Sequence, residues 1–264
     1  MTRPPRQPFP NPARPREPVS SMELAVVLAA MAVGAFVKGV TGSGLPQLAI
    51  PAIASFAGVE PAVVIMSIPG VVTNTWLLRT FWDHRGETRD LPVLLVMGSV
   101  GAVAGTWLLR SLNEDVLSVA LGVIVVIYIS VFFAHPTLRL GPRVTRKLSP
   151  GVGTAAGLLQ GATGISGPLV TTYLHSFRLS KQAYIFSITT IFQVFAVVQT
   201  AMLVALGMFD RERLALSLIS LIPIMILMPL GTRAAKRLPH RAFDLAVLAV
   251  MGLSAVRLLY DGLT

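Results

Sequence analysis

Apolar runs long enough to cross a lipid bilayer fill most of this 264-residue sequence. A transmembrane helix needs about 20 mainly apolar residues to span roughly 30 Å of hydrocarbon. Charged residues make up 13% of the chain, whereas soluble domains carry about 25%. The sequence therefore predicts an all-α polytopic membrane protein. Its eight apolar segments cover about residues 24–58, 61–82, 91–109, 116–134, 151–174, 182–206, 214–233 and 242–260.

Two of these segments are interrupted by the same glycine-rich motif. Residues 39–46 read GVTGSGLP and residues 161–168 read GATGISGP, so glycine, threonine, glycine and proline recur in register. Glycine and proline inside a helix cost about 1 and 3 kcal/mol relative to alanine. Non-helical backbone within a bilayer is tolerated only where protein buries it or a water-filled cavity meets it. Matching breaks in two halves of a chain indicate a transporter's binding site, while a seam of small residues between helices is the alternative.

A second repeat indicates that the whole unit is duplicated. Residues 105–112 (GTWLLRSL) match residues 231–238 (GTRAAKRL) in glycine, threonine, a basic residue and leucine. Two matches in the same order predict two homologous halves of four segments, the first segment of each half being broken. We expect a first transmembrane repeat at 22–136, a basic connector at 137–150 and a second repeat at 151–264. The halves are parallel if every segment crosses once and inverted if the first and fifth segments fold back, and hydropathy leaves both open.

Residues 1–21 form a segment of another kind. Seven prolines and four arginines among residues 1–20 predict a disordered basic tail. The tail lacks the pattern of a signal peptide, so we expect it to stay attached. If each segment crosses once, fourteen Lys and Arg residues lie on the side of the termini and seven on the other. Because basic residues mark the cytoplasmic side, we expect a multi-pass protein of the cell (inner) membrane with both termini in the cytoplasm.

Composition excludes several classes of partner. The formal charge of +10 comes from arginines placed between apolar segments, which is the orientation signal of a membrane protein and not a nucleic-acid footprint. The chain has no cysteine and only four scattered histidines, so we expect no metal site and no cofactor. The expected partners are a small anionic substrate and the lipid bilayer, with no nucleic acid. A second copy of the chain, as a homodimer, is a further candidate.

The residues around the two motifs suit an anion. A broken helix presents free backbone N–H groups and the positive end of a helix dipole. Lys38 precedes the first break and is the one cation well inside an apolar segment, where an ionisable residue indicates function unless it snorkels to the interface. Its counterpart is the neutral Gln160. The candidate substrate-binding residues are Lys38, Gly39, Thr41, Gly42, Ser43, Gly44, Pro46, Asn74, Gln160, Gly161, Thr163, Gly164, Ser166, Gly167, Pro168 and Gln193.

These polar residues have defined roles in that hypothesis. The hydroxyls of Thr41, Ser43, Thr163 and Ser166 would donate to oxyanion oxygens. The amides of the second and sixth segments, Asn74, Gln193 and Gln199, would line the same cavity or bond helix to helix. Every Asp and Glu falls in the tail, in a connection or near a segment end. An exported negative charge gains roughly 2.3 kcal/mol per 100 mV of inside-negative potential, so facilitated export needs no coupling carboxylate.

Both glycine motifs, the layout of two halves of four segments, and the glycine-to-basic ends at 105–112 and 231–238 resemble the TauE/SafE family of sulfite exporters. The resemblance covers roughly residues 22–260. It implies a secondary transporter of small sulfur oxyanions or organosulfonates, such as sulfite or sulfoacetate. In this sequence Thr41, Ser43 and Leu45 stand where glycine or another small residue is usual in the family.

Two other classes compete with a transporter. Residues 164–167 read GISG, the nucleophile signature of rhomboid-type intramembrane serine proteases, and a serine nucleophile needs a base within hydrogen-bond reach. His175 lies nine residues further along the same segment, about 13 Å away on a straight helix. We therefore expect no enzyme and no catalytic residue. A membrane scaffold without transport is the third class, and two repeated breaks exceed what a scaffold requires.

Overall fold

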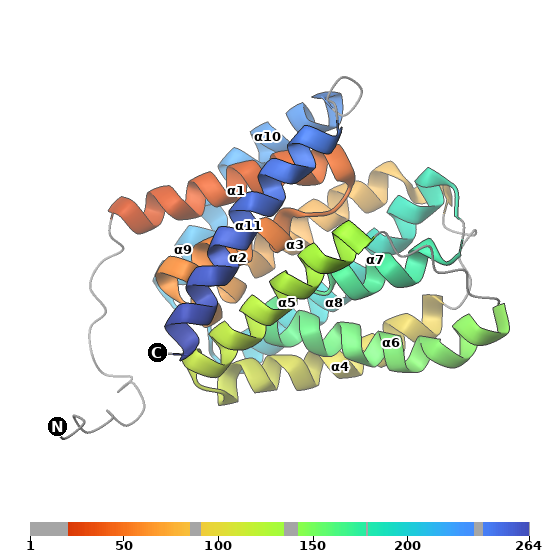
Figure 1. The fold of residues 1–264 in the computed structure, drawn as a ribbon, viewed down its shortest axis with the longest axis horizontal. Coiled ribbons are helices and arrows are strands. Elements are labelled where there is room, and N and C mark those ends of the chain that lie inside the picture. Colours follow the sequence, from red (N-terminus) through yellow and green to blue (C-terminus); the bar gives the residue numbers. More distant parts are fainter. Residues whose placement is uncertain (1–20, 85–90, 135–141, 178, 235–239, 264) are drawn as a thin grey trace.

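The computed structural model describes residues 21–84, 91–134, 142–177, 179–234 and 240–263 of the chain, and the expected tail lies outside them. Within these ranges the protein is helical and contains no strand. Figure 1 shows the helices packed side by side in one bundle. The helices are α1 (Ser21–Thr41), α2 (Leu45–Ala57), α3 (Val59–Thr80), the short 3-10 helix η1 (Trp82–His84), α4 (Leu91–Ser111), α5 (Glu114–Ala134), α6 (Pro142–Thr163), α7 (Gly167–His175), α8 (Lys181–Ala205), α9 (Arg211–Ile219), α10 (Leu221–Ala234) and α11 (His240–Leu263).

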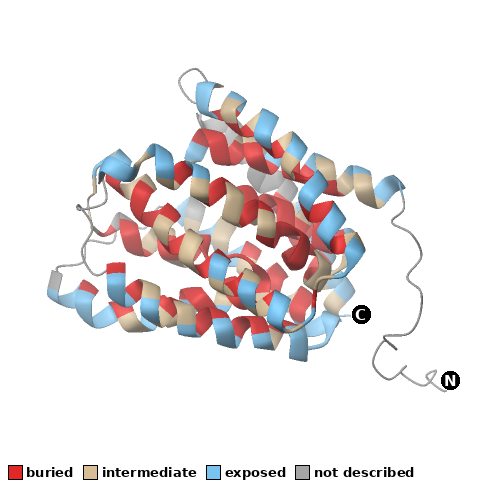
Figure 2. Ribbon diagram, turned by 180° about the vertical axis from the view of Figure 1, so that it is seen from behind, coloured by how far each residue is buried: buried red, intermediate tan, exposed pale blue. Residues whose placement is uncertain are grey.

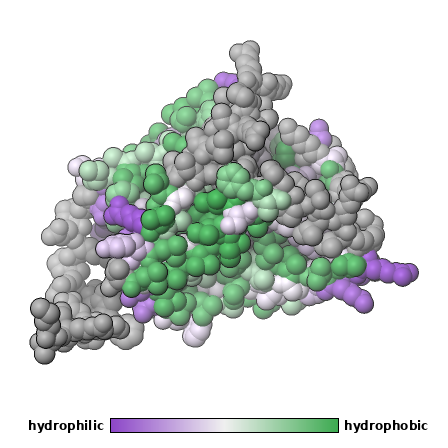
Figure 3. Space-filling view, viewed as in Figure 1, coloured by the Kyte–Doolittle hydropathy of each residue, from purple (hydrophilic) through white to green (hydrophobic). Residues whose placement is uncertain are grey.

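The outer surface of the bundle is that of an integral membrane protein. In the described ranges six stretches are long and apolar enough to span a bilayer: α1, α3, α4, α5, α8, and α9 with α10 taken together. Large apolar side chains such as Val96 and Ile222 are 64% exposed, which water would not favour but lipid does. Figure 3 shows apolar side chains over the middle of one face and hydrophilic ones toward its ends. Buried residues concentrate on the inner helices (Figure 2).

The first broken segment folds back on itself. Helix α1 ends at Thr41, and α2 begins at Leu45 after a turn in which Gly42 and Gly44 have φ values of 81° and 111°. A Cβ on Gly34 would lie 3.1 Å from the carbonyl oxygen of Leu45, so α2 starts about two turns back along α1 (Figure 1). Because α2 has 13 residues, it is about 20 Å long and shorter than the hydrocarbon layer.

The second broken segment has the same form. Helix α6 ends at Thr163, and α7 begins at Gly167 after a turn in which Gly164 has a φ of 71°. Near the end of α7, the hydroxyl of Tyr173 donates to the carbonyl oxygen of Thr145 at 2.8 Å and hydrogen-bonds the hydroxyl of Ser149 at 2.7 Å. Both partners lie near the start of α6, so α7 runs back along α6.

The two fold-backs fix the direction of every later helix. We call the side of the bundle where α1 begins and α11 ends the terminal side, and the side where α5 ends and α6 begins the connector side (Figure 1). Helix α1 starts from the terminal side and α6 from the connector side, so the helices that open the two halves run in opposite directions. The orientation expected from the sequence assumed that every segment crosses the membrane once. The two fold-backs do not fit that assumption. The duplication itself stays a prediction.

The glycine motif at each break packs against the glycine-to-basic motif of the other half, 39–46 against 231–238 and 161–168 against 105–112. A Cβ on Gly39 would lie 3.0 Å from the Cα of Gly231, and a Cβ on Gly161 would lie 2.8 Å from the carbonyl carbon of Gly105. Side chains at these positions would separate the backbones of α1 and α10, and of α4 and α6. Gly39 and Gly161 therefore belong to seams of small residues between helices, which was the alternative reading of the motifs. Each broken segment packs against a helix of the other half.

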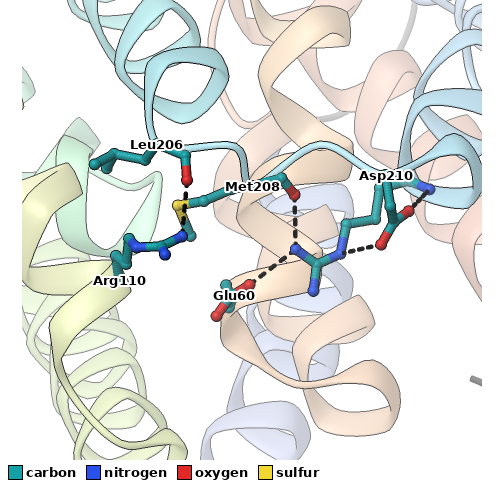
Figure 4. A network of polar contacts seen from close by, with 6 residues as sticks. Glu60, Arg110, Leu206, Met208 and Asp210 are labelled. Carbon is teal, nitrogen blue, oxygen red and sulfur yellow. Dashed lines mark hydrogen bonds and ion pairs between the residues drawn. The ribbon is translucent and has the colours of Figure 1, made fainter. Parts of the chain in front are cut away.

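A buried cation closes the terminal side of the bundle (Figure 4). Arg213, at the start of α9, is 5% exposed. Its guanidinium donates to the Oε1 of Glu60 and to the carbonyl oxygen of Met208, both at 2.8 Å, and pairs with Asp210 at 3.4 Å. Arg110 at the end of α4 donates to the carbonyl oxygen of Leu206 at 2.7 Å. These contacts join α3 and α4 to the connection between α8 and α9.

We predict that Arg213→Ala lowers the free energy of unfolding by about 3–5 kcal/mol, because it leaves a partly buried carboxylate and a buried carbonyl without their donor. The matched control is Arg257→Ala. The ion pair of Arg257 with Asp261 is 3.6 Å long, and both side chains are about half exposed. Its loss, together with the contact to the Phe56 ring, should cost under about 1 kcal/mol. Thermal unfolding in detergent measures both variants, and equal midpoints would contradict the assigned role of Arg213.

Candidate functional site

A pocket lies in the centre of the bundle where the two fold-backs meet. It encloses about 500 Å³ of empty volume, including the part that opens to solvent. Helices α1, α2, α3, α6, α7 and α8 and both breaks contribute to its wall. The lining residues are Lys38, Ser43, Gly44, Pro46, Gln47, Ile50, Val63, Met66, Ser67, Gly70, Asn74, Gln160, Gly164, Ile165, Ser166, Gly167, Phe192, Ala196 and Gln199.

The N-termini of α2 and α7 both line this pocket. The first backbone bonds of the two helices run from Leu48 N to Gly44 O and from Val170 N to Ser166 O, so earlier N–H groups have no intrahelical acceptor. In the described part of the chain neither N-terminus has a side-chain cap. The two ends touch, since a Cβ on Gly167 would lie 2.0 Å from the Nε2 of Gln47.

Lys38 is the cation of the pocket. Its side chain is 2% exposed and lies inside α1. The Nζ donates to the Oγ1 of Thr73 at 2.9 Å and to the Oδ1 of Asn74, both on α3. An ammonium group has three N–H donors, so one remains for a ligand. Among the described residues Lys38 forms no ion pair, and its burial contradicts the snorkelling alternative.

The second half places neutral groups where the first half has this cation. Gln160 donates from its Nε2 to the Oε1 of Gln199 at 3.2 Å, and its Oε1 accepts from the Oγ of Ser166 at 2.9 Å. The Nε2 of Gln199 donates to the carbonyl oxygens of Gln160 and Gly161 at 2.7 and 3.1 Å. These side chains are hydrogen-bonded to one another and to the backbone, and none of them is charged.

The repeated threonines shape the breaks and do not reach the pocket. The hydroxyl of Thr41 donates to the carbonyl oxygen of Val37 at 3.0 Å and accepts from the N–H of Ser43 at 3.3 Å. Thr163 repeats this pattern with Leu159 at 2.8 Å and Ile165 at 3.4 Å. Their hydroxyls are thus engaged with the local backbone. Of the four predicted hydroxyl residues, Ser43 and Ser166 line the pocket.

The structure brings together most of the predicted site and leaves some residues outside it. Gly39 and Gly161 lie in the helix seams, and Gly42 faces Ile185. Gln193 donates to the Oγ1 of Thr75 at 3.0 Å and is not among the lining residues. The predicted residues that line the pocket are Lys38, Ser43, Gly44, Pro46, Asn74, Gln160, Gly164, Ser166 and Gly167, while Gly39, Thr41, Gly42, Gly161, Thr163, Pro168 and Gln193 do not.

Several lining residues escaped the sequence analysis. Gln47 directly follows the first motif and lies in the first turn of α2, so its proximity to Pro46 was the available signal. Gln199 did not escape it: the sequence analysis expected this amide in the same cavity or in a helix–helix bond, and it lines the pocket with its partner Gln160. The apolar wall of Ile50, Val63, Met66, Phe192 and Ala196 gave no signal, because these residues look like any others in apolar helices.

The pocket reaches the protein surface at the first break. Of the described residues that line it, all but Ser43 and Pro46 are buried. The adjacent Gly42 lies against Ile185, one turn from the connector-side end of α8. The opening is therefore on the connector side, opposite the Arg213 network that closes the terminal side.

The geometry does not support a serine protease. The hydroxyl of Ser166 donates to the amide oxygen of Gln160, a group that does not accept a proton in catalysis. His175 is the last residue of α7, whereas Ser166 precedes its first residue. The side chain of His175 lies outside the described residues.

The family model of the sulfite exporter TauE/SafE matches residues 26–258. The chain belongs to the TauE/SafE family. This confirms the resemblance seen in the glycine motifs, and it identifies the protein as a member of a family of membrane transporters. The match spans both fold-backs and all the residues of the pocket. Comparisons with curated proteins and with solved structures give no match.

Proposed function

We propose that this TauE/SafE protein is a secondary transporter that exports small sulfur-containing anions, such as sulfite or organosulfonates. The anion would bind between the N-termini of α2 and α7, beside Lys38. The observation that carries the proposal is the meeting of two uncapped helix ends and one buried, unpaired lysine in a single pocket.

Physical chemistry favours an anion at this position. Each helix N-terminus acts as about half a positive charge and offers free N–H groups. Both effects are stronger away from bulk water, since Coulomb energies rise as the effective dielectric constant falls. The free N–H of Lys38 adds a charge-assisted hydrogen bond, which is shorter and stronger than a neutral one. A cation would meet positive potential from three directions.

The driving force follows from what lines the pocket. No Asp or Glu is among the described residues of its wall, whereas proton- and sodium-coupled carriers commonly keep an acidic residue within the membrane. An inside-negative potential favours the exit of each negative charge by roughly 2.3 kcal/mol per 100 mV. We propose facilitated export driven by this potential and by the substrate gradient.

The fold-backs change the orientation that basic residues indicate. With α2 and α7 returning to the side they came from, seven Lys and Arg residues of the described helices lie on the connector side: Arg79, Arg143, Arg146, Lys147, Lys181, Arg233 and Arg241. Four lie on the terminal side, Arg110, Arg211, Arg213 and Arg257, and Lys38 is in the pocket. Since basic residues mark the cytoplasmic side, we propose that the connector side faces the cytoplasm and both termini face away from it. In this orientation the pocket opens toward the cytoplasm, where an exporter takes up its substrate.

We predict that proteoliposomes containing the protein show saturable flux of sulfite or an organosulfonate and none of a sugar or an alkali cation.

Lys38→Gln should weaken anion binding about ten- to hundredfold, because it removes one charge-assisted contact of about 1.5–3 kcal/mol. The matched control is Gln193→Ala. Gln193 carries an amide side chain on α8 and does not line the pocket, so this variant should keep flux near the wild-type value. Flux of a sugar or cation with no response to any anion would overturn the proposal.

A second prediction tests the orientation. The chain contains no cysteine, so single cysteines can be placed without background. Ser111→Cys is exposed on the terminal side, and Val144→Cys is exposed on the connector side. In intact cells a membrane-impermeant maleimide should label Ser111→Cys, and it should label Val144→Cys only after the membrane is opened. Labelling of Val144→Cys but not of Ser111→Cys in intact cells would place both termini in the cytoplasm. That is the orientation expected from the count of basic residues when every segment crosses the membrane once.

A further inference from the structure

The first two turns of α6, residues 142–149, pack against the bundle through one side. Thr145 and Ser149 are buried, and the hydroxyl of Tyr173 on α7 bonds to both. A helix turns by about 100° per residue, so the residues next to these two point away from α7. Those that are exposed are Arg143, Val144, Arg146, Lys147 and Leu148.

A stripe of exposed residues marks the side of α6 that faces lipid. Exposed positions recur at intervals of four and three along the helix, which places them on one side of it. The other side is packed on α4, where a Cβ on Gly153 or Gly157 would meet backbone atoms of Leu94 and Gly98. The stripe runs through Val144, Leu148, Gly151, Ala155 and Leu158.

The middle of this stripe is indented. Gly151 and Ala155 lie between the larger side chains of Leu148 and Leu158, which are about 15 Å apart along the helix. A Cβ on Gly151 would meet no atom within 4 Å, so the space above it is open. The stripe therefore offers a shallow apolar channel that starts at Leu148 and leads into the bilayer.

Two cations border the upper end of this channel. Arg143 and Lys147 directly precede Val144 and Leu148 and lie one helical turn apart. Neither forms an ion pair with a described residue. From Val116 to Phe209 the sequence contains six Lys and Arg residues and no Asp or Glu. Figure 3 shows hydrophilic side chains at the end of the bundle where α6 begins. The charge is suited to an anionic group from outside the chain.

The two cations lie at the membrane–water interface. On the same connector side Trp82, which follows α3, is 53% exposed, and exposed tryptophans mark the level of the lipid headgroups. A helix end with a basic face beside an apolar face is typical of such an interface. The long stems of Arg143 and Lys147 let their charged ends reach the headgroup layer while the stripe stays in contact with acyl chains.

We propose that the start of α6 binds an anionic phospholipid of the leaflet on the connector side. Its phosphate would lie between Arg143 and Lys147, and one acyl chain would follow Leu148, Gly151 and Ala155. The guanidinium can donate two parallel hydrogen bonds to a phosphate, and the ammonium adds a compact charge. None of these residues lines the central pocket, so the lipid site is distinct from the proposed transport site.

The test measures lipid binding to the purified full-length protein in detergent by native mass spectrometry. The probes are phosphatidylglycerol and phosphatidylcholine with identical acyl chains, so that only the headgroup charge differs. The wild-type protein should bind its first phosphatidylglycerol at least tenfold more tightly than phosphatidylcholine. Equal affinities for the two lipids would overturn the proposal.

Charge variants locate the headgroup. Arg143→Gln and Lys147→Gln should each weaken binding of phosphatidylglycerol about fivefold, and the double variant should lose most of the preference for it. The matched control is the double variant Arg211→Gln with Arg257→Gln, which removes two exposed cations from the terminal side. Its affinity should stay within about twofold of the wild-type value. Equal losses in the two double variants would contradict the site, since net charge alone would then account for binding.

A variant of the stripe locates the acyl chain. Leu148→Gln keeps both cations and should weaken phosphatidylglycerol binding at least threefold, because it places an amide at the mouth of the channel. Leu253→Gln makes the same change at a position of α11 that is 74% exposed and should have no effect. Glycerol 3-phosphate, the soluble headgroup without acyl chains, should not displace the lipid. Displacement by it, together with an unaltered affinity in Leu148→Gln, would mean a site for free phosphate and would overturn the lipid site.

Discussion

The structure depends on one constraint, which is that backbone N–H groups inside a bilayer must find partners. Two helices of this protein begin in the middle of the bundle, at Leu45 and at Gly167, and lipid could not solvate their first N–H groups. The fold therefore surrounds both ends with protein. Gly39 against Gly231 and Gly105 against Gly161 allow backbones to approach closely enough for this. We propose that a ligand with oxyanion oxygens is the partner of these ends.

The two halves contribute unequally to that ligand site. The first half supplies Lys38, Asn74 and the exposed edge of its break at Ser43. The second half supplies a helix end and the closed group of Gln160, Ser166 and Gln199. Both halves thus offer a helix end, and among the described lining residues the first half alone adds a charged side chain. The pocket also opens beside the first break, at Ser43 and Pro46, whereas the Arg213 network joins α3 to the connection between α8 and α9 on the terminal side (Figure 4).

Periodicity and composition were sufficient to predict an all-helical membrane protein, and the glycine motifs pointed to the pocket and to the TauE/SafE family. Lys38 and Asn74 could be named because polar residues stand out in apolar segments. The role of Thr41 and Thr163 could not be predicted, since a threonine that bonds its own backbone has the same sequence as one that binds a ligand. Orientation was also beyond hydropathy. It depends on whether α2 and α7 return to the side they came from. Only three-dimensional contacts reveal that, such as Gly34 beside Leu45 and Tyr173 bonded to Thr145.

We propose that one anion lies between the N-termini of α2 and α7, beside Lys38. A crystal structure with 2-bromoethanesulfonate tests it most directly, because bromine gives an anomalous signal that locates the ligand without ambiguity. We expect the sulfonate within hydrogen-bond distance of the Lys38 Nζ, between the two helix N-termini. Anomalous density at a surface arginine, with the central pocket empty at a saturating concentration, would contradict it.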